Sequence, residues 1–183
     1  MKKKLLLLCL FLISISSVYS QHYLAKTIKS VNLRESASVD ADILKKLNVN
    51  KDIFVFEEET ENDFYHIIDI ESDTEGYVHK DYLKLIKPMS RNQGKTFTKD
   101  NDIEEYDSKI KIQNDTNRNL TLRLNSTIYT FTPYERKEID LSPGFYTILA
   151  SSPGVTPYSG GDDVISNSSY SWKFFIRTTT VRR

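Results

Sequence analysis

The chain has 183 residues, with 25 basic and 25 acidic side chains and a single cysteine, Cys9. This balance of charge argues against a nucleic-acid-binding protein, because such a protein carries a basic face or stripe. One cysteine cannot form an internal disulfide, so the fold must be held together by burial of apolar side chains.

The first 20 residues have the pattern of a secretory signal. Three lysines at positions 2–4 precede an apolar run over residues 5–15, and Val-Tyr-Ser at residues 18–20 suits a signal peptidase. The alternative, a retained membrane helix, needs roughly 20 apolar residues, and this run is shorter. Cleavage after residue 20 leaves 22 basic and 25 acidic residues, a net charge of −3, and no cysteine. We therefore expect an exported protein, periplasmic or secreted, with no membrane span after signal cleavage.

Short segments of alternating apolar and polar residues follow, and none has the period of a long amphipathic helix. This pattern predicts an all-β protein. We expect residues 21–87 to form a first domain. Its predicted strands cover residues 31–34, 53–56, 64–70, 75–79 and 84–86.

The alternation stops at residues 88–108, a polar and charged stretch that predicts a linker. It returns in residues 109–183, which we expect to form a small antiparallel β-sandwich. The predicted strands of this second domain are centred on residues 110–112, 120–124, 128–131, 139–141, 145–150 and 169–177. Alternating aromatic residues such as Trp172 and Phe174 are expected in its core, because burial of every second residue explains them without a ligand.

Two short segments frame the first domain. They read VNLRESAS at residues 31–38 and GYVHKDYL at residues 76–83. They resemble the bacterial SH3-like domain, whose usual opening is L-N-V-R-x-G-P-S and whose usual close is G-W-V-x-x-x-Y-L. Between them, residues 43–47 correspond to the second strand of that family, and residues 63–67 stand where it usually reads N-G-W-Y-K-V. The resemblance covers residues 24–86 and implies a small barrel.

This resemblance also implies a binding function, because domains of the family commonly bind peptidoglycan or protein peptides. A peptide groove needs flat aromatic walls and a few polar groups that fix orientation. The aromatic candidates for ligand binding are Phe64, Tyr77 and Tyr82. The polar candidates are Asn32, Arg34 and Glu35. For each of them the alternative is a packing role or a surface ion pair.

Two histidines lie on the predicted hairpin of the first domain. If the hairpin turns through residues 71–74, His66 faces His79, and two imidazoles at that distance could share a cation or a proton. The alternative is two independent surface histidines, and we predict no metal site because no third ligand stands at a suitable spacing.

The sequence predicts no enzyme and no cofactor. After signal cleavage the chain has no cysteine nucleophile, and the second domain has no histidine. The sequence Gly-Gly-Asp-Asp at residues 160–163 could contribute to a calcium site, but one acidic pair is short of the 6 to 8 oxygens that calcium takes, and a solvated turn is the simpler interpretation. We expect a non-catalytic protein that binds cell-wall or protein peptides; the alternative is a structural or assembly protein that interacts through its C-terminal β domain.

Overall fold

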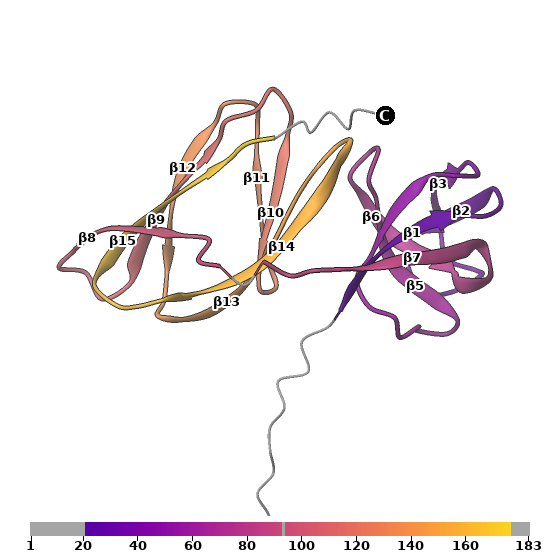
Figure 1. The fold of residues 1–183 in the computed structure, drawn as a ribbon, viewed down its shortest axis with the longest axis horizontal. Coiled ribbons are helices and arrows are strands. Elements are labelled where there is room, and N and C mark those ends of the chain that lie inside the picture. Colours follow the sequence, from indigo (N-terminus) through magenta and orange to yellow (C-terminus); the bar gives the residue numbers. More distant parts are fainter. Residues whose placement is uncertain (1–20, 93, 177–183) are drawn as a thin grey trace, which may run out of the picture.

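The computed structural model describes residues 21–92 and 94–176. The predicted signal and Cys9 lie outside this range. The described chain contains fifteen strands and one short 3-10 turn, so the all-β prediction is confirmed. Figure 1 shows two β domains side by side, joined by the segment that follows β7.

The first domain is a seven-stranded sheet in the order β3-β2-β6-β5-β4-β1-β7. Its elements are β1 (His22–Thr27), β2 (Val31–Arg34), β3 (Ile43–Leu47), β4 (Asp52–Val55), β5 (Phe64–Asp69), β6 (Thr74–His79), η1 (Lys80–Tyr82) and β7 (Leu83–Met89). Side chains alternate between the two faces of each strand. Ile53, Val55 and Ile67 point into the core of this domain, whereas Phe54 and Ile68 point to the opposite face and belong to a second cluster.

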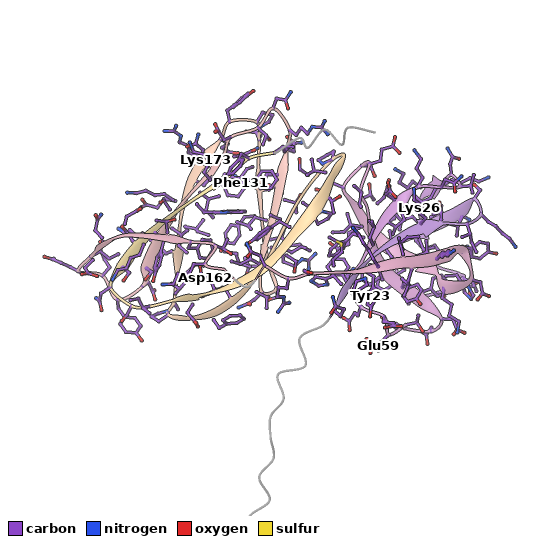
Figure 2. All side chains as sticks on the ribbon, viewed as in Figure 1. Tyr23, Lys26, Glu59, Phe131, Asp162 and Lys173 are labelled. Carbon is purple, nitrogen blue, oxygen red and sulfur yellow. The ribbon has the colours of Figure 1, made fainter. Side chains whose placement is uncertain are left out.

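The second domain consists of two four-stranded sheets, in the orders β11-β10-β13-β14 and β12-β9-β15-β8. Its strands are β8 (Thr98–Asp102), β9 (Ser108–Asn114), β10 (Leu120–Leu124), β11 (Thr127–Phe131), β12 (Arg136–Leu141), β13 (Gly144–Ser152), β14 (Val155–Val164) and β15 (Ser168–Phe174). One core joins both sheets and contains Ile110, Leu122 and Phe131; Figure 2 shows Phe131 within it. The predicted β-sandwich is therefore confirmed. Its pairing is not wholly antiparallel, because β9 and β15 run parallel.

The aromatic residues of β15 lie in or against the core of the second domain, as the sequence predicts. Phe174 is buried, and Trp172 is partly buried and packs against the same core. The ring of Trp172 lies 6.4 Å from that of Phe97 and 6.0 Å from that of Phe174. The core prediction for Trp172 and Phe174 is confirmed.

The linker predicted at residues 88–108 is wrong in its second half. Residues 98–102 form β8, which pairs with β15 and closes one edge of the sandwich. The preceding residues are fixed by the buried carboxylate of Asp162, whose Oδ2 accepts hydrogen bonds from the backbone N–H groups of Thr96 at 2.7 Å and Phe97 at 2.8 Å. Asp162 lies in β14, so the predicted Gly-Gly-Asp-Asp turn is also wrong: these residues belong to a ten-residue strand.

The hairpin of β5 and β6 is paired two residues away from the predicted register. Asp69 faces Thr74, so His66 faces Tyr77 and His79 faces Phe64. The turn closes early because Asp73 adopts a φ of 59°, and the carbonyl of Asp69 accepts hydrogen bonds from the backbone N–H groups of the two turn residues before Thr74. The predicted opposition of His66 and His79 is therefore wrong.

The outer face of the first domain is partly covered by the second domain. Phe54, Ile68 and Ile70 form a buried cluster with Leu149, which projects from the outer face of β13. The turns of the β5–β6 and β13–β14 hairpins also meet, where the N–H of Gly154 donates to the carbonyl of Ile70 at 2.6 Å. This apolar contact holds the two domains together, since burial of apolar surface is the main driving force for such association.

A polar arrangement beside this cluster ties the domains further. His66 lies between the rings of Phe56 and Tyr77, with centroid distances of 4.1 and 4.9 Å. Its Nε2 is 2.8 Å from Oε1 of Glu75, and Arg123 of β10 donates from Nη2 to Oε2 of Glu75 at 2.5 Å. Burial alone would raise the pKa of Glu75, but the hydrogen bond with His66 and the charge of Arg123 hold that pKa below its ordinary value. Glu75 is therefore a charged link between the domains.

Candidate functional site

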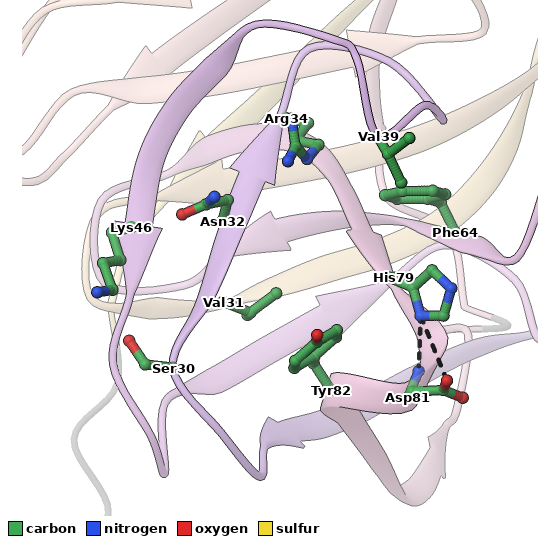
Figure 3. A pocket seen from close by; sticks show the side chains of 10 residues that line it. All are labelled: Ser30, Val31, Asn32, Arg34, Val39, Lys46, Phe64, His79, Asp81 and Tyr82. Atoms are coloured by element: carbon green, nitrogen blue, oxygen red, sulfur yellow. Dashed lines mark hydrogen bonds and ion pairs between the residues drawn. The ribbon is translucent and has the colours of Figure 1, made fainter.

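A cavity of 480 Å³ opens where β2, the start of β5 and η1 meet. Four of the six predicted binding residues line it: Asn32, Arg34, Phe64 and Tyr82 (Figure 3). They come from three segments of the first domain that are distant in sequence. The fold thus brings most of the predicted site together.

The strand β2 presents the polar residues of this cavity. Val31 and Leu33 are buried in the core, so Asn32 and Arg34 are directed to the other face of the strand. The guanidinium of Arg34 donates from Nη1 to the carbonyl of Ala41 at 2.7 Å, which anchors it against the loop that follows β2. Gly76 allows β6 to approach this strand, because a Cβ at that position would lie 2.5 Å from the carbonyl oxygen of Arg34.

Three rings form the aromatic part of the cavity. The imidazole of His79 has its centroid 5.2 Å from that of Phe64 and 6.0 Å from that of Tyr82, edge-on in both cases. Its Nδ1 accepts a hydrogen bond from the backbone N–H of Asp81 at 3.3 Å and so caps η1. In Figure 3 the side chain of Val39 lies against Phe64, and Tyr82 lies beyond His79. The η1 turn therefore orients Tyr82 toward the cavity.

The other two predicted residues lie elsewhere. Tyr77 lines a neighbouring cavity of 270 Å³, whose wall also includes Phe64, His66 and the carboxylates of Glu57, Glu59 and Glu61. Burial raises the pKa of the Tyr77 phenol, and the negative charges of Glu61 and Glu75 raise it further. Glu35 is exposed after β2 and is not among the residues that line either cavity.

The two cavities differ in charge and share one wall. Arg34, Lys46 and His79 line the first, with Asp81 as the only carboxylate, whereas three glutamates line the second. Phe64 contributes to both. Because Phe64 is only 4% exposed, it separates the two cavities, and a ligand that spans both would meet basic groups on one side and acidic groups on the other.

Comparison with known families agrees with this geometry. Residues 29–84 match the family model of the bacterial SH3 domain. The first domain is a bacterial SH3 domain. The match runs from the residues before β2 through η1, and so includes every strand that contributes to the two cavities. A comparison with curated proteins finds no match.

Six further residues line the SH3 cavity and were not among the predicted binding residues, namely Ser30, Val31, Val39, Lys46, His79 and Asp81. Lys46 faces Asn32 across the β2–β3 pair, and His79 faces Phe64 across the β5–β6 pair. A correct prediction of these two strand registers would have placed Lys46 and His79 opposite predicted binding residues. Val39 and Asp81 lie in a loop and in a short turn, where no periodic pattern gives their direction.

No group of three or more His, Cys, Asp or Glu side chains suited to a metal ion occurs in residues 21–92 and 94–176. Across the same part of the chain, no helix has the length and apolar character needed to cross a membrane.

Proposed function

We propose that the chain is an exported, non-catalytic protein whose SH3 domain binds peptides of the cell wall or of a partner protein. The observation that supports this most is the convergence of Asn32, Arg34, Phe64 and Tyr82 on one cavity of 480 Å³ in a domain of a binding family. Concave sites with aromatic walls and a few convergent polar groups are typical of ligand binding.

The charges around Phe64 favour a peptide over an uncharged ligand. Arg34 and Lys46 would pair with a carboxylate, and Glu57, Glu59 and Glu61 would pair with an amine. The partly exposed rings of Tyr77 and Tyr82 supply apolar area at a low cost in side-chain entropy. Peptidoglycan stem peptides and protein segments both carry these groups.

Export rests on the signal-like pattern of residues 1–20. The non-catalytic part of the proposal rests on the residue inventory, because after residue 20 the chain has no cysteine and its three histidines, His22, His66 and His79, all lie in the SH3 domain.

Binding of residues 21–183 to purified peptidoglycan, measured by co-sedimentation, tests the proposal. The double variant Asn32→Ala, Lys46→Ala changes two cavity residues that are not part of the apolar core, and we expect at least tenfold weaker binding. The matched control is Lys87→Ala, which removes an exposed lysine of β7, the strand at the opposite edge of the sheet from β3 and β2.

Equal binding by the double variant and the control would show that this cavity is not the binding site. A synthetic stem peptide and a peptidoglycan sample stripped of its peptides separate peptide recognition from glycan recognition. Binding to the stripped sample alone would overturn peptide recognition.

A further inference from the structure

His66 connects the binding surface of the SH3 domain to the sandwich domain. It lines the acidic cavity of 270 Å³, and its Nε2 lies 2.8 Å from Oε1 of Glu75. The other carboxylate oxygen of Glu75 accepts a hydrogen bond from Arg123, which belongs to β10 of the sandwich domain. A chain of hydrogen bonds therefore runs from the second domain to a wall of this cavity.

The same hydrogen bonds determine which nitrogen of the imidazole carries a proton. Burial opposes ionisation of Glu75, but the hydrogen bond with His66 and the charge of Arg123 hold its pKa below the ordinary value, so this carboxylate is ionised at neutral pH. An ionised carboxylate only accepts hydrogen bonds, so Nε2 of His66 must donate to it. A neutral imidazole has one protonated nitrogen and one that accepts. Nδ1 of His66 is therefore the acceptor.

Two aromatic rings fix the orientation of this imidazole. The ring of Phe56 stacks on His66 at a centroid distance of 4.1 Å and an interplanar angle of 11°, and that of Tyr77 at 4.9 Å and 15°. Arg123 also covers Phe56, with its Cζ 5.8 Å from the ring centroid. The imidazole cannot tilt without losing these ring contacts, so its two nitrogens keep separate roles.

Nδ1 is the nitrogen of His66 that remains for a ligand. It has no hydrogen-bond partner within residues 21–92 and 94–176, and the imidazole is 30% exposed. The exposed carboxylates of Glu57, Glu59 and Glu61 line the same cavity, and none of them makes an ion pair within 4.0 Å in that part of the chain. A ligand ammonium would therefore meet both an acceptor and negative charge.

We infer that the sandwich domain completes the SH3 site: Arg123, acting through Glu75, holds His66 in the tautomer whose Nδ1 accepts a hydrogen bond from a ligand amine. This inference rests on the proposed peptide binding and names the ligand group that the acidic cavity takes. His66 contacts the ligand, whereas Glu75 and Arg123 are positioning residues. Protonation of Nδ1 on acidification turns the acceptor into a donor and places a positive charge beside the amine, so binding weakens as the pH falls.

The tautomer is tested in the free protein, without any ligand. Nitrogen NMR of residues 21–183 with labelled histidine, at about pH 8, distinguishes a protonated ring nitrogen from an unprotonated one, and His66→Gln assigns the signals. We expect the proton on Nε2 in the parent chain and in Arg123→Lys, which keeps a charged donor. Arg123→Met and Glu75→Gln should give a mixture of both tautomers. The matched control is Arg136→Met, which makes the same change at an exposed arginine of β12.

Titration calorimetry tests the ligand group. The probes are a synthetic stem peptide with a free lysine amine and the same peptide acetylated at that amine, each at about pH 8 and about pH 5, the range in which histidine changes charge. We expect the free-amine peptide to bind the parent chain about tenfold more weakly at the lower pH and the acetylated peptide to bind weakly at both. His66→Gln should remove most of this pH dependence, and what remains measures titration of the glutamates.

The outcomes separate this inference from the proposed function. A proton on Nδ1 in the parent chain, or an Arg123→Met spectrum that matches the parent, overturns the inference whatever the protein binds. Binding of the free-amine peptide that is unaffected by pH and by Arg123→Met also overturns it, and leaves the proposed function intact. If neither peptide binds although the tautomer is as expected, the proposed peptide binding fails, and the assignment of the ligand amine fails with it.

Discussion

The contact between the domains depends on Leu149, and its truncation should destabilise the protein. Leu149 is 9% exposed and projects from the sandwich domain onto Phe54 and Ile68 of the SH3 domain, which are 0% and 3% exposed. Both partners are fixed in a sheet and cannot move far to fill a gap. We expect Leu149→Ala to lower the free energy of unfolding by about 2 to 3 kcal/mol.

The magnitude follows from what the substitution removes. Leucine exceeds alanine by three carbons, and each buried methylene group contributes roughly 0.8 kcal/mol, which gives about 2.4 kcal/mol for transfer alone. The remaining 9% exposure reduces this value slightly. An unfilled gap beside Phe54 adds to the loss, because the neighbouring side chains lose van der Waals contacts.

Urea unfolding followed by fluorescence and by far-ultraviolet circular dichroism measures this loss. The single tryptophan of the chain, Trp172, reports on the sandwich domain, whereas circular dichroism reports on both domains. Ile128→Ala is the matched control, because Ile128 is 50% exposed and should cost no more than ~1 kcal/mol. If Leu149→Ala costs no more than Ile128→Ala, the contact does not stabilise the protein as we argue.

Three further changes test other parts of the structure. Gly76→Ala should cost about 1 to 3 kcal/mol in urea unfolding, because its Cβ would lie 2.5 Å from the carbonyl oxygen of Arg34; a neutral effect would contradict the close approach of β2 and β6. Asp162→Ala should cost about 1 to 3 kcal/mol by leaving two buried backbone N–H groups without an acceptor, and thermal unfolding that matches the parent chain would argue against this role. The ionised form of Glu75 is favoured in the folded protein, so its contribution is present above its ordinary pKa of 4.5 and is lost as the pH falls below that value through the lower pKa of the folded state. The stability difference between the parent chain and Glu75→Gln should therefore shrink on acidification below pH 4.5, and a constant difference would contradict the link with His66.

The sequence predicts most of the first domain, because its strands alternate clearly and its framing motifs have a fixed order. The same alternation predicts Asn32 and Arg34 on the exposed face of β2. It does not predict which residues cover the outer face of β4. Residues 53–56 are apolar at every position, which indicates a strand buried on both sides. The side chain that covers Phe54 is that of Leu149, which lies almost a hundred residues later in the sequence.

The errors have physical causes in particular residues. Composition favours a turn at residues 160–163, yet Gly161 lies in a strand under the ring of Phe145, where a Cβ would be 2.5 Å from the ring. The glycine there serves ring packing and does not make a turn. The hairpin register was wrong because its turn depends on Asp73 in a left-handed conformation, which a general turn pattern does not specify.

The covered face of β4 and β5 means that this SH3 domain is not a portable module. Excision after residue 90 would expose Phe54, Ile68 and Ile70, which are at most 8% exposed in the intact chain. A contiguous apolar surface of this kind promotes self-association. Grafting the domain into another protein would therefore require polar replacements on this face, and natural rearrangements of this chain would have to move both domains as one unit.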